Sequence, residues 1–337
     1  MADHIHNDLL IEILARLPVA SLLQFKSVCK TWYSLITSPS FVTKHLDQSI
    51  TNTKRNGSKI IVRVYGTYCT KERYLLLDDD DDQFGDEYSE LEVPFELLFG
   101  CFRIVGSCNG LLCVLDYYFI AKCQIIIWNP STRKSEYKVI RLEYEWVEWD
   151  LKLPPKVEIY TQGTRLWRGI SSAAPSYGIS MRCQAFVDGA VHWVAYEPCV
   201  GGGVRNLIML FNMASESFSE FKLPPTLAYQ PPPSLSIKKL GQSMAVVCSG
   251  PRDSSGCCIW LMKEYGVAES WTKLFSSNLL GRPNRTLGFR KKGEVLLATD
   301  KCLASYAPGT NTLATTGFRG NSPIFYIYQF METLVLV

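Results

Sequence analysis

RCQAFVDGAVHWVAY, residues 182–196, holds two apolar runs on either side of Asp188-Gly189. Asp-Gly supplies the positive φ angles that a two-residue hairpin turn requires. The stretch therefore predicts two antiparallel strands joined by a tight turn. Three other stretches have the same form: FRIVGSCNGLLCVLD at 102–116, SIKKLGQSMAVVC at 236–248 and TLGFRKKGEVLLAT at 286–299.

A hairpin of a second type follows each of these four, so the repeating unit is predicted to have four strands. The second hairpins are expected at 125–135, 207–223, 258–275 and 302–318. The turn glycines Gly189, Gly241 and Gly293 are 52 residues apart each time, which fits a kelch-like propeller blade. Since no long amphipathic helix interrupts the chain beyond residue 58, this region is predicted to be an all-β propeller.

The spacing is irregular between Gly110 and Gly189, which are 79 residues apart. That distance is too long for one blade and short for two, and it contains one more second-type hairpin at 157–170. The turn NPSTRKS runs straight into a strand expected at 137–142, with no partner strand before it. The pattern indicates that a first-type strand, or most of one hairpin, is absent after Lys134. The alternative is a repeat that is simply irregular at this point.

The N-terminal region has a different pattern. DLLIEILARLPVASLLQFKSVCKTWYSLI, residues 8–36, contains eighteen apolar residues in twenty-nine. Pro18 ends a first helix, Ser21 can cap a short second one, and Val28 and Trp32 mark one face of a third. The apolar sector of the first helix is about 200° wide, whereas packing on one neighbour needs about half of that. We expect the surplus to bind helices of a partner protein; the alternative is that it packs on the β region.

This stretch resembles the F-box. The family pattern of a helix ending in Leu-Pro, a short Leu-rich turn and then Val-Cys-Lys-x-Trp is found at 13–19, 21–23 and 28–32. The resemblance implies docking on a Skp-type adaptor and, through it, on a cullin-based ubiquitin ligase. The residues that it assigns to adaptor binding are Leu9, Ile13, Leu14, Leu17, Pro18, Leu22, Val28, Cys29 and Trp32.

The β region resembles the plant F-box-associated interaction domain, a class that includes S-locus F-box proteins and related F-box/kelch-repeat proteins. The likeness lies in GSCNGLLC at 106–113, WNPST at 128–132, and WLMKEYG at 260–266 with ESWTK at 269–273. In that family a loop and a further strand separate the Asn-Pro-Ser-Thr element from the next strand. Here residues 135–141 follow at once, so the resemblance also indicates a deletion.

The expected fold is mainly β with a small α domain. A three-helix F-box at 1–46 is followed by a polar linker at 47–58. A kelch-like β-propeller at 59–337 then binds the substrate, and one of its blades is expected to be incomplete.

No motif indicates catalysis or a metal. None of the four histidines is placed with cysteines at a zinc-ligand spacing, and neither a nucleophile elbow nor a P-loop is found. We therefore expect no catalytic residue, metal or cofactor, and we expect His192, beside Trp193, to have a structural role. Five tryptophans that recur in the repeats are expected to pack between blades: Trp128, Trp167, Trp193, Trp260 and Trp271.

Composition restricts the partners further. A net charge of +3, with both signs interspersed, favours neither nucleic acid nor an anionic membrane. The first residues lack the pattern of a secretory signal, and the twelve cysteines lie mostly in apolar runs, as reduced thiols of a core do. These features predict an intracellular protein of the cytoplasm, the nucleus or both.

The leading hypothesis is a substrate-recognition subunit of a Skp-cullin-F-box (SCF) ubiquitin ligase, which would not itself be an enzyme. One alternative is a β-propeller enzyme with a helical cap. Another is a family member whose propeller is impaired by the deletion after Lys134. The sequence does not identify the protein substrate or the residues that bind it, although the loops at 145–149 and 229–233 are candidates.

Overall fold

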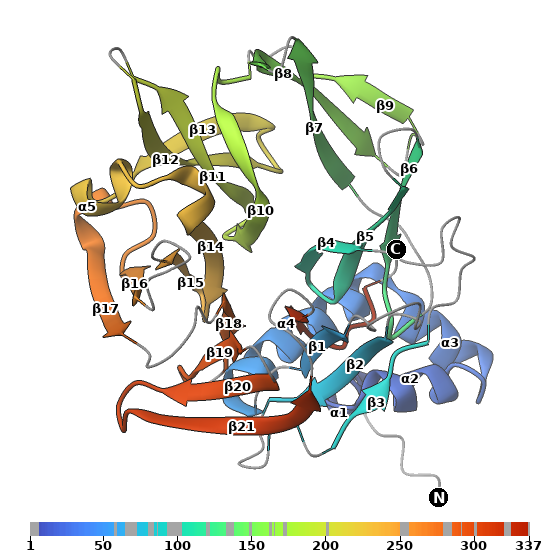
Figure 1. Ribbon diagram of the computed structural model, residues 1–337. Helices are drawn as coiled ribbons and strands as arrows, with labels where there is room; N and C mark the ends of the chain where they lie inside the picture. The colour runs from blue at the N-terminus through green and yellow to red at the C-terminus, as the bar shows by residue number, and fades with distance from the viewer. Residues whose placement is uncertain are drawn as a thin grey trace, which may run out of the picture. The chain divides into compact units, whose positions relative to one another are not determined.

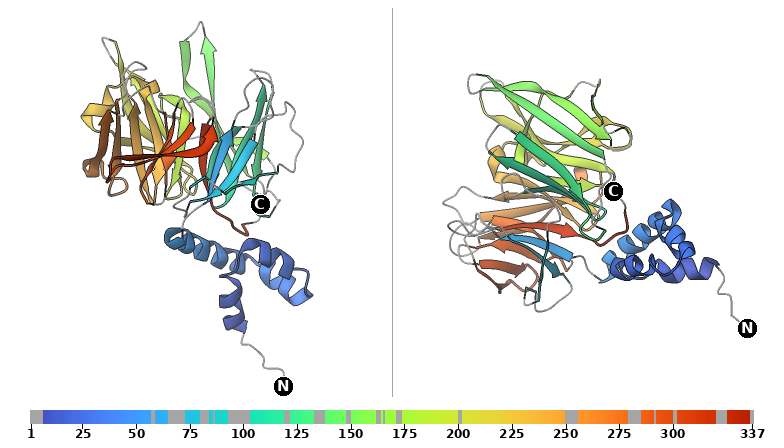
Figure 2. Two further views of the ribbon diagram at one scale, coloured as in Figure 1. Left: turned by 60° about the horizontal axis from the view of Figure 1, so that its bottom comes forward. Right: turned by 90° about the vertical axis from the view of Figure 1, so that its right-hand side faces the viewer.

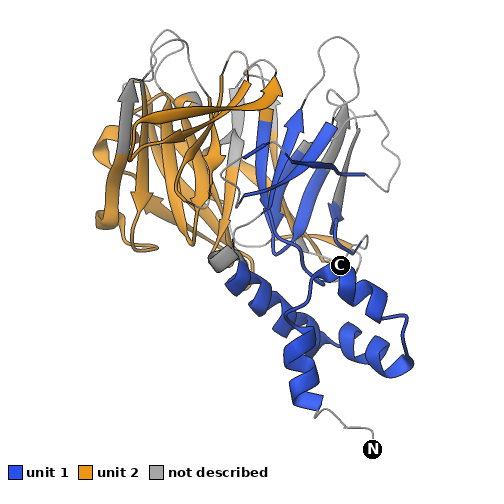
Figure 3. Ribbon diagram, turned by 90° about the horizontal axis from the view of Figure 1, so that it is seen from below, with its two compact units in different colours: residues 1–136, 326–337 blue, residues 137–325 orange. Residues whose placement is uncertain are grey.

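The computed structural model describes most of the 337 residues. The described ranges are 7–56, 59–64, 73–79, 84–85, 87–92, 103–118, 122–132, 138–147, 150–161, 164, 166–170, 174–199, 202–249, 256–278, 285–290, 292–299, 302–319 and 325–335. The chain forms two compact units (Figure 3). One comprises residues 1–136 with 326–337, and the other comprises residues 137–325.

The first unit begins with four helices that pack together (Figure 2). They are α1 (Asn7–Leu14), α2 (Val19–Phe25), α3 (Lys30–Thr37) and α4 (Pro39–Asn56). Three were expected. The fourth begins at Pro39, as proline is tolerated in a first helical turn, and continues to Asn56. The polar stretch expected as a linker at 47–58 is therefore, as far as Asn56, the second half of a helix.

Two antiparallel sheets complete this unit (Figure 1). The first has the strand order β22-β1-β2-β3, from β1 (Lys59–Val64), β2 (Arg73–Asp78), β3 (Ser89–Glu90) and the last strand of the chain, β22 (Phe325–Phe330). The second has the order β4-β5-β6, from β4 (Arg103–Cys108), β5 (Leu111–Tyr118) and β6 (Lys122–Trp128). Ile61 and Phe330 of the first sheet share a buried cluster with Ile104, Leu112 and Trp128 of the second.

The second unit contains four antiparallel sheets in chain order. The strands of the first two are β7 (Lys138–Val147), β8 (Asp150–Thr161) and β9 (Leu166–Gly169), then β10 (Gly178–Val187), β11 (Ala190–Pro198), β12 (Val204–Asn212) and β13 (Ser217–Lys222). Those of the last two are β14 (Leu235–Leu240), β15 (Ser243–Ser249), β16 (Gly256–Met262) and β17 (Trp271–Asn278), then β18 (Arg285–Phe289), β19 (Val295–Ala298), β20 (Cys302–Ala307) and β21 (Thr312–Arg319). Short helical turns lie between strands: α5 (Pro225–Ala228), η1 (Pro232–Ser234) and η2 (Ala268–Ser270).

The four predicted first-type hairpins are confirmed. Each of the four first-type hairpins is the opening strand pair of a sheet, namely β4/β5, β10/β11, β14/β15 and β18/β19. Asn109-Gly110 has φ values of 49° and 79°, and Asp188-Gly189 has 48° and 72°, as the turn chemistry requires. The structure has N-terminal helices followed by six sheets, which confirms the predicted fold class. The β-propeller has six blades.

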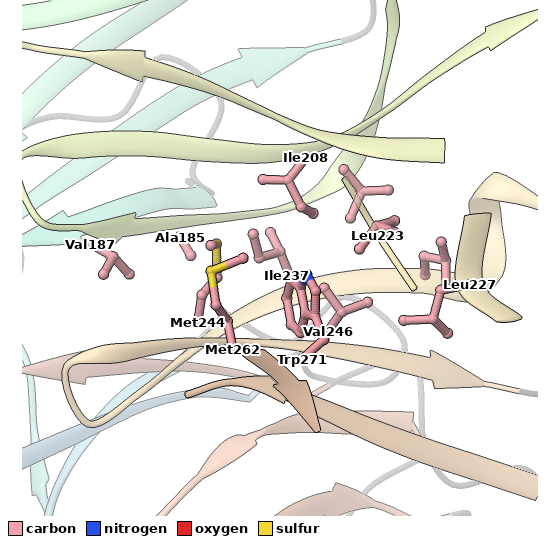
Figure 4. Packing of buried hydrophobic residues seen from close by; sticks show 12 residues of the cluster. Ala185, Val187, Ile208, Leu223, Leu227, Ile237, Met244, Val246, Met262 and Trp271 are labelled. Atoms are coloured by element: carbon pink, nitrogen blue, oxygen red, sulfur yellow. The ribbon is translucent and has the colours of Figure 1, made fainter. Parts of the chain in front are cut away.

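Buried side chains lie between successive sheets of the second unit. Figure 4 shows one such cluster, in which Ile208 of β12 and Leu223 meet Ile237 of β14 and Trp271 of β17. Similar clusters join Ile159 to Trp193 and Val247 to Val295. Sheet-on-sheet packing of this kind needs large side chains from both layers.

The tryptophan prediction is confirmed for four of the five residues. Trp128, Trp193 and Trp271 are buried in these clusters, and Trp260 packs against one of them. The prediction is wrong for Trp167, which is 38% exposed on β9. Trp167 lies on an edge strand of its sheet, and the guanidinium carbon of Arg141 lies over its indole, 4.7 Å from the ring centroid.

Two sheets have three strands among the described residues, whereas the others have four. They are β4-β5-β6 and β7-β8-β9, which flank residues 133–137 in the sequence. The strand expected at 137–142 is β7, and among the described residues it pairs with β8 alone, at the edge of its sheet. The end of the hairpin expected at 125–135 lies outside the described residues.

Candidate docking site on the N-terminal helices

The N-terminal helices share one buried core, which contains two of the nine residues assigned to adaptor binding. Leu14 of α1 and Leu22 of α2 are buried there with Ile36 of α3 and Phe41 of α4. Leu17 and Trp32 are partly buried against the same core. One further member, Leu334, comes from the other end of the chain. Leu14 and Leu22 therefore support the helices from within.

The other five predicted residues are exposed. Leu9 and Ile13 are 56% and 43% exposed, and they lie one turn apart on α1, so they share a face of the helix. Val28 is 65% exposed, and Pro18 and Cys29 are also exposed. Exposed apolar side chains of this size, gathered on a small helical unit, are typical of a protein-binding surface.

Tyr33 belongs with these residues and was not predicted. It is 55% exposed on α3, four residues after Cys29, which places the two on one face of that helix. The helical spacing from Cys29 could have indicated it. The prediction followed the family motif, which ends at Trp32.

Local contacts explain why α3 begins where it does. The Cys29 side chain is the N-cap, since its Sγ accepts a hydrogen bond of 3.5 Å from the Trp32 backbone N–H. The Trp32 ring packs edge-on against Phe25 of α2, with 5.2 Å between ring centres. Trp32 thus fixes α3 on α2, so we assign it to the support of the exposed residues around it.

Polar contacts fasten α1 to α4. Lys44 Nζ lies 2.5 Å from Glu12 Oε1, and this contact lowers the pKa of Glu12. His45 is buried, and its Nε2 lies 3.2 Å from the Leu17 carbonyl oxygen, in the turn between α1 and α2. Burial lowers the pKa of His45, so the neutral ring, donating from Nε2, fits this position.

No candidate metal centre is found in the part of the chain that the structure describes. There, no group of three or more His, Cys, Asp or Glu side chains is placed to hold a metal ion. His192 is fully buried between the Ala185 carbonyl oxygen, 3.3 Å from Nδ1, and the Tyr265 hydroxyl, 2.9 Å from Nε2. Both ring nitrogens have partners, and burial lowers its pKa, as expected of a structural histidine.

One of the two candidate substrate loops can be examined. Tyr229 is largely exposed beside a cavity of about 190 Å³ that lies between β12, β13 and α5. Arg205, Glu220 and Lys222 line it together with Phe221. The side chains of the other loop, 145–149, lie outside the described residues. In the same described part of the chain, no helix is long and apolar enough to cross a membrane.

Helices with an apolar outer surface, followed by six antiparallel sheets, define the class of F-box proteins that carry a β-propeller. The chain belongs to the F-box associated beta propeller domain family, whose model matches residues 131–307, more than half of the chain. The F-box domain model matches residues 3–44. An F-box implies binding to a Skp-type adaptor, and members of this family are adaptors rather than enzymes.

The chain is similar over most of its length to F-box proteins of Arabidopsis thaliana. The chain is 24% identical to F-box/kelch-repeat protein At3g23880 over 318 residues, which covers 80% of this chain and 79% of that protein. It is also 24% identical to F-box protein CPR1 over 341 residues, with 87% of this chain and 77% of that protein covered. The predicted resemblance to plant F-box proteins with a kelch-type C-terminal domain is confirmed.

Proposed function

We propose that this protein is the substrate-recognition subunit of an SCF-type ubiquitin ligase. It docks on a Skp-type adaptor through the exposed apolar residues of α1, α3 and the turns beside them, and it presents a protein substrate on the propeller. It acts by raising the effective concentration of the substrate near the ubiquitin-carrying enzyme. Its place of action is the cytoplasm, the nucleus or both.

The exposed side chains of Leu9, Ile13 and Val28 carry this proposal. Burying a large apolar side chain contributes about 2 kcal/mol, so a few such anchors support a stable interface. The contact set that we propose differs from the predicted one: Leu9, Ile13, Pro18, Val28 and Cys29 face the adaptor directly, and Tyr33 joins them. Leu17 contributes at the edge of this contact, Trp32 supports it by holding α3 on α2, and Leu14 and Leu22 hold the helices in place.

Co-purification of a Skp-type adaptor with the full chain tests the proposal. Leu9→Asp and Val28→Asp place a charge in the contact and should reduce adaptor capture at least tenfold while the helical circular dichroism is kept. Leu313→Asp is the matched control, because Leu313 is 48% exposed on β21, outside the helices. The proposal is wrong if the wild-type chain captures no adaptor, or if both surface variants capture as much as the control.

A second candidate is a family member that docks on the adaptor but cannot hold a substrate. Among the described residues, the sheets on either side of residues 133–137 in the sequence have three strands each, which favours this candidate. Limited proteolysis separates the candidates: a propeller weakened by a deletion should be cut first near 129–138. An intact substrate-binding domain should resist cleavage there. Proximity labelling from the propeller, with and without proteasome inhibition, then identifies substrates of the intact form.

A further inference from the structure

The segment that follows the last strand, Met331–Val335, is fastened to the sheet β4-β5-β6. Thr333 is fully buried, and its Oγ1 donates a hydrogen bond of 2.9 Å to the Asn109 carbonyl oxygen, in the turn between β4 and β5. Two residues before the segment, the Gln329 carbonyl oxygen accepts a hydrogen bond of 2.9 Å from Ser107 Oγ of β4. Side-chain bonds therefore hold the segment against this turn.

Asn129 holds the same segment from the end of β6. Its side chain is fully buried, and Nδ2 donates to two carbonyl oxygens, those of Thr333 at 3.0 Å and Val335 at 2.8 Å. Its Oδ1 accepts a bond of 2.8 Å from the Ser131 backbone N–H. Both amide protons and the oxygen are thus used, which makes Asn129 specific for this position.

Gly110 permits the close approach. A Cβ at this position would lie 2.4 Å from Thr333 Oγ1 and 2.6 Å from the Met331 carbonyl oxygen. The φ of 79° also disfavours any residue with a side chain. The turn Asn109-Gly110 and the motif residue Asn129 therefore form two sides of one receptor for the segment.

The residue between these anchor points enters the helical core. Leu334 is 1% exposed and belongs to the buried cluster that contains Leu14, Leu22, Ile36 and Phe41. Five residues of the chain thus contact two structures at once, the sheet β4-β5-β6 through Thr333 and the helices through Leu334. All of these residues lie within the first compact unit.

We propose that Met331–Val335 is a clamp that completes the core of the F-box and fixes the F-box to the sheet β4-β5-β6. Asn129 and Thr333 act as positioning residues, since they hold the backbone from which Leu334 reaches the helices. The consequence of the clamp rests on the proposed function. If an adaptor binds the helices, the clamp fixes the direction in which that adaptor lies relative to the sheet β4-β5-β6.

Hydrogen exchange of the full-length chain, without adaptor, tests the clamp. Leu334→Asp should speed amide exchange in α1–α3 about tenfold or more, because local opening of the helices becomes easier. Leu313→Asp is the matched control and should leave these helices unchanged. Leu334→Ala is the milder variant if the aspartate abolishes the fold. Unchanged exchange in the helices of both Leu334 variants would overturn the proposal.

Asn129→Asp tests the coupling, because it keeps the shape and the acceptor but replaces the two donated bonds with repulsion between oxygens. Exchange should then rise in the helices as well as in the 107–112 turn. Thr333→Val, which removes one donor without loss of volume, should give a smaller rise in both places. A rise confined to the turn would show that the segment does not fix the helices. Adaptor capture is measured separately, so failure of docking and failure of the clamp are distinguishable.

Discussion

The indole Nε1 of Trp271 donates a hydrogen bond of 3.0 Å to the backbone carbonyl oxygen of Lys222. Trp271 begins β17 and Lys222 ends β13, so the bond joins the last strands of two successive sheets. Trp271→Phe should lower the free energy of unfolding of the second unit by about 1–3 kcal/mol, since it leaves a carbonyl unpaired and removes buried volume. Chemical denaturation measures this. Trp167→Phe, at a partly exposed site, should cost at most about 1 kcal/mol.

Substitutions in the core and on the surface of the F-box should have different effects on stability and on adaptor binding. Leu22→Ala should destabilise the helices by about 2–5 kcal/mol, as is typical of a fully buried leucine. Leu9→Ala should change the stability of the helices by no more than about 0.5 kcal/mol. Of the two variants, only Leu9→Ala should weaken the adaptor complex that the folded protein forms. Thermal unfolding and adaptor titration give the two readouts. Equal destabilisation by both variants would contradict the burial that separates these residues.

The stability of the second unit should fall in mild acid because of His192. Burial lowers its pKa in the folded state, so the unfolded chain binds a proton that the folded chain does not. The free energy of unfolding should therefore decrease as the pH falls below about 6.5, by at most about 1.4 kcal/mol per pH unit. His192→Gln should flatten this dependence between pH 7 and pH 5. An identical slope in the variant would assign the acid sensitivity to other groups.

Cys258 should react before its neighbour Cys248. Cys248 and Cys258 lie opposite each other on β15 and β16, and the hydrogen bond that Cys248 donates lowers the pKa of Cys258 and raises that of Cys248. Iodoacetamide at pH 7 should therefore modify Cys258 before Cys248, as mapped by peptide mass spectrometry. Cys248→Ala should slow the reaction. Cys113, whose pKa burial raises to about 12, is the unreactive reference.

Hairpins were predictable because their signals are local. The dipeptides Asn109-Gly110 and Asp188-Gly189 predict tight hairpin turns by themselves, and the 52-residue spacing of the turn glycines indicates the repeat. The helical core was less accessible, since the apolar width of α1 does not show which leucines face inward. Leu14 and Leu22 were grouped with exposed Leu9 for that reason. The polar composition of residues 47–56 favoured a linker, but these residues continue helix α4, which begins at Pro39.

Nothing local could have indicated the clamp. Thr333 and Leu334 stand in an apolar stretch that resembles any strand end, and their partners lie more than two hundred residues earlier in the sequence. Asn129 was noted as part of a motif, but a motif in one chain does not reveal what its side chain binds. Such contacts depend on the tertiary structure of the first compact unit.

The first sheet takes β1–β3 from one end of the described chain and β22 from the other, and the helical core likewise includes Leu334. During synthesis, the helices and the first strands leave the ribosome before these partners exist, and they must wait while five further sheets are made. Loops that close over such long separations form slowly. A chain whose translation stops before Leu334 therefore lacks one member of the helical core, so the docking helices are fully packed only in chains that are translated beyond this residue.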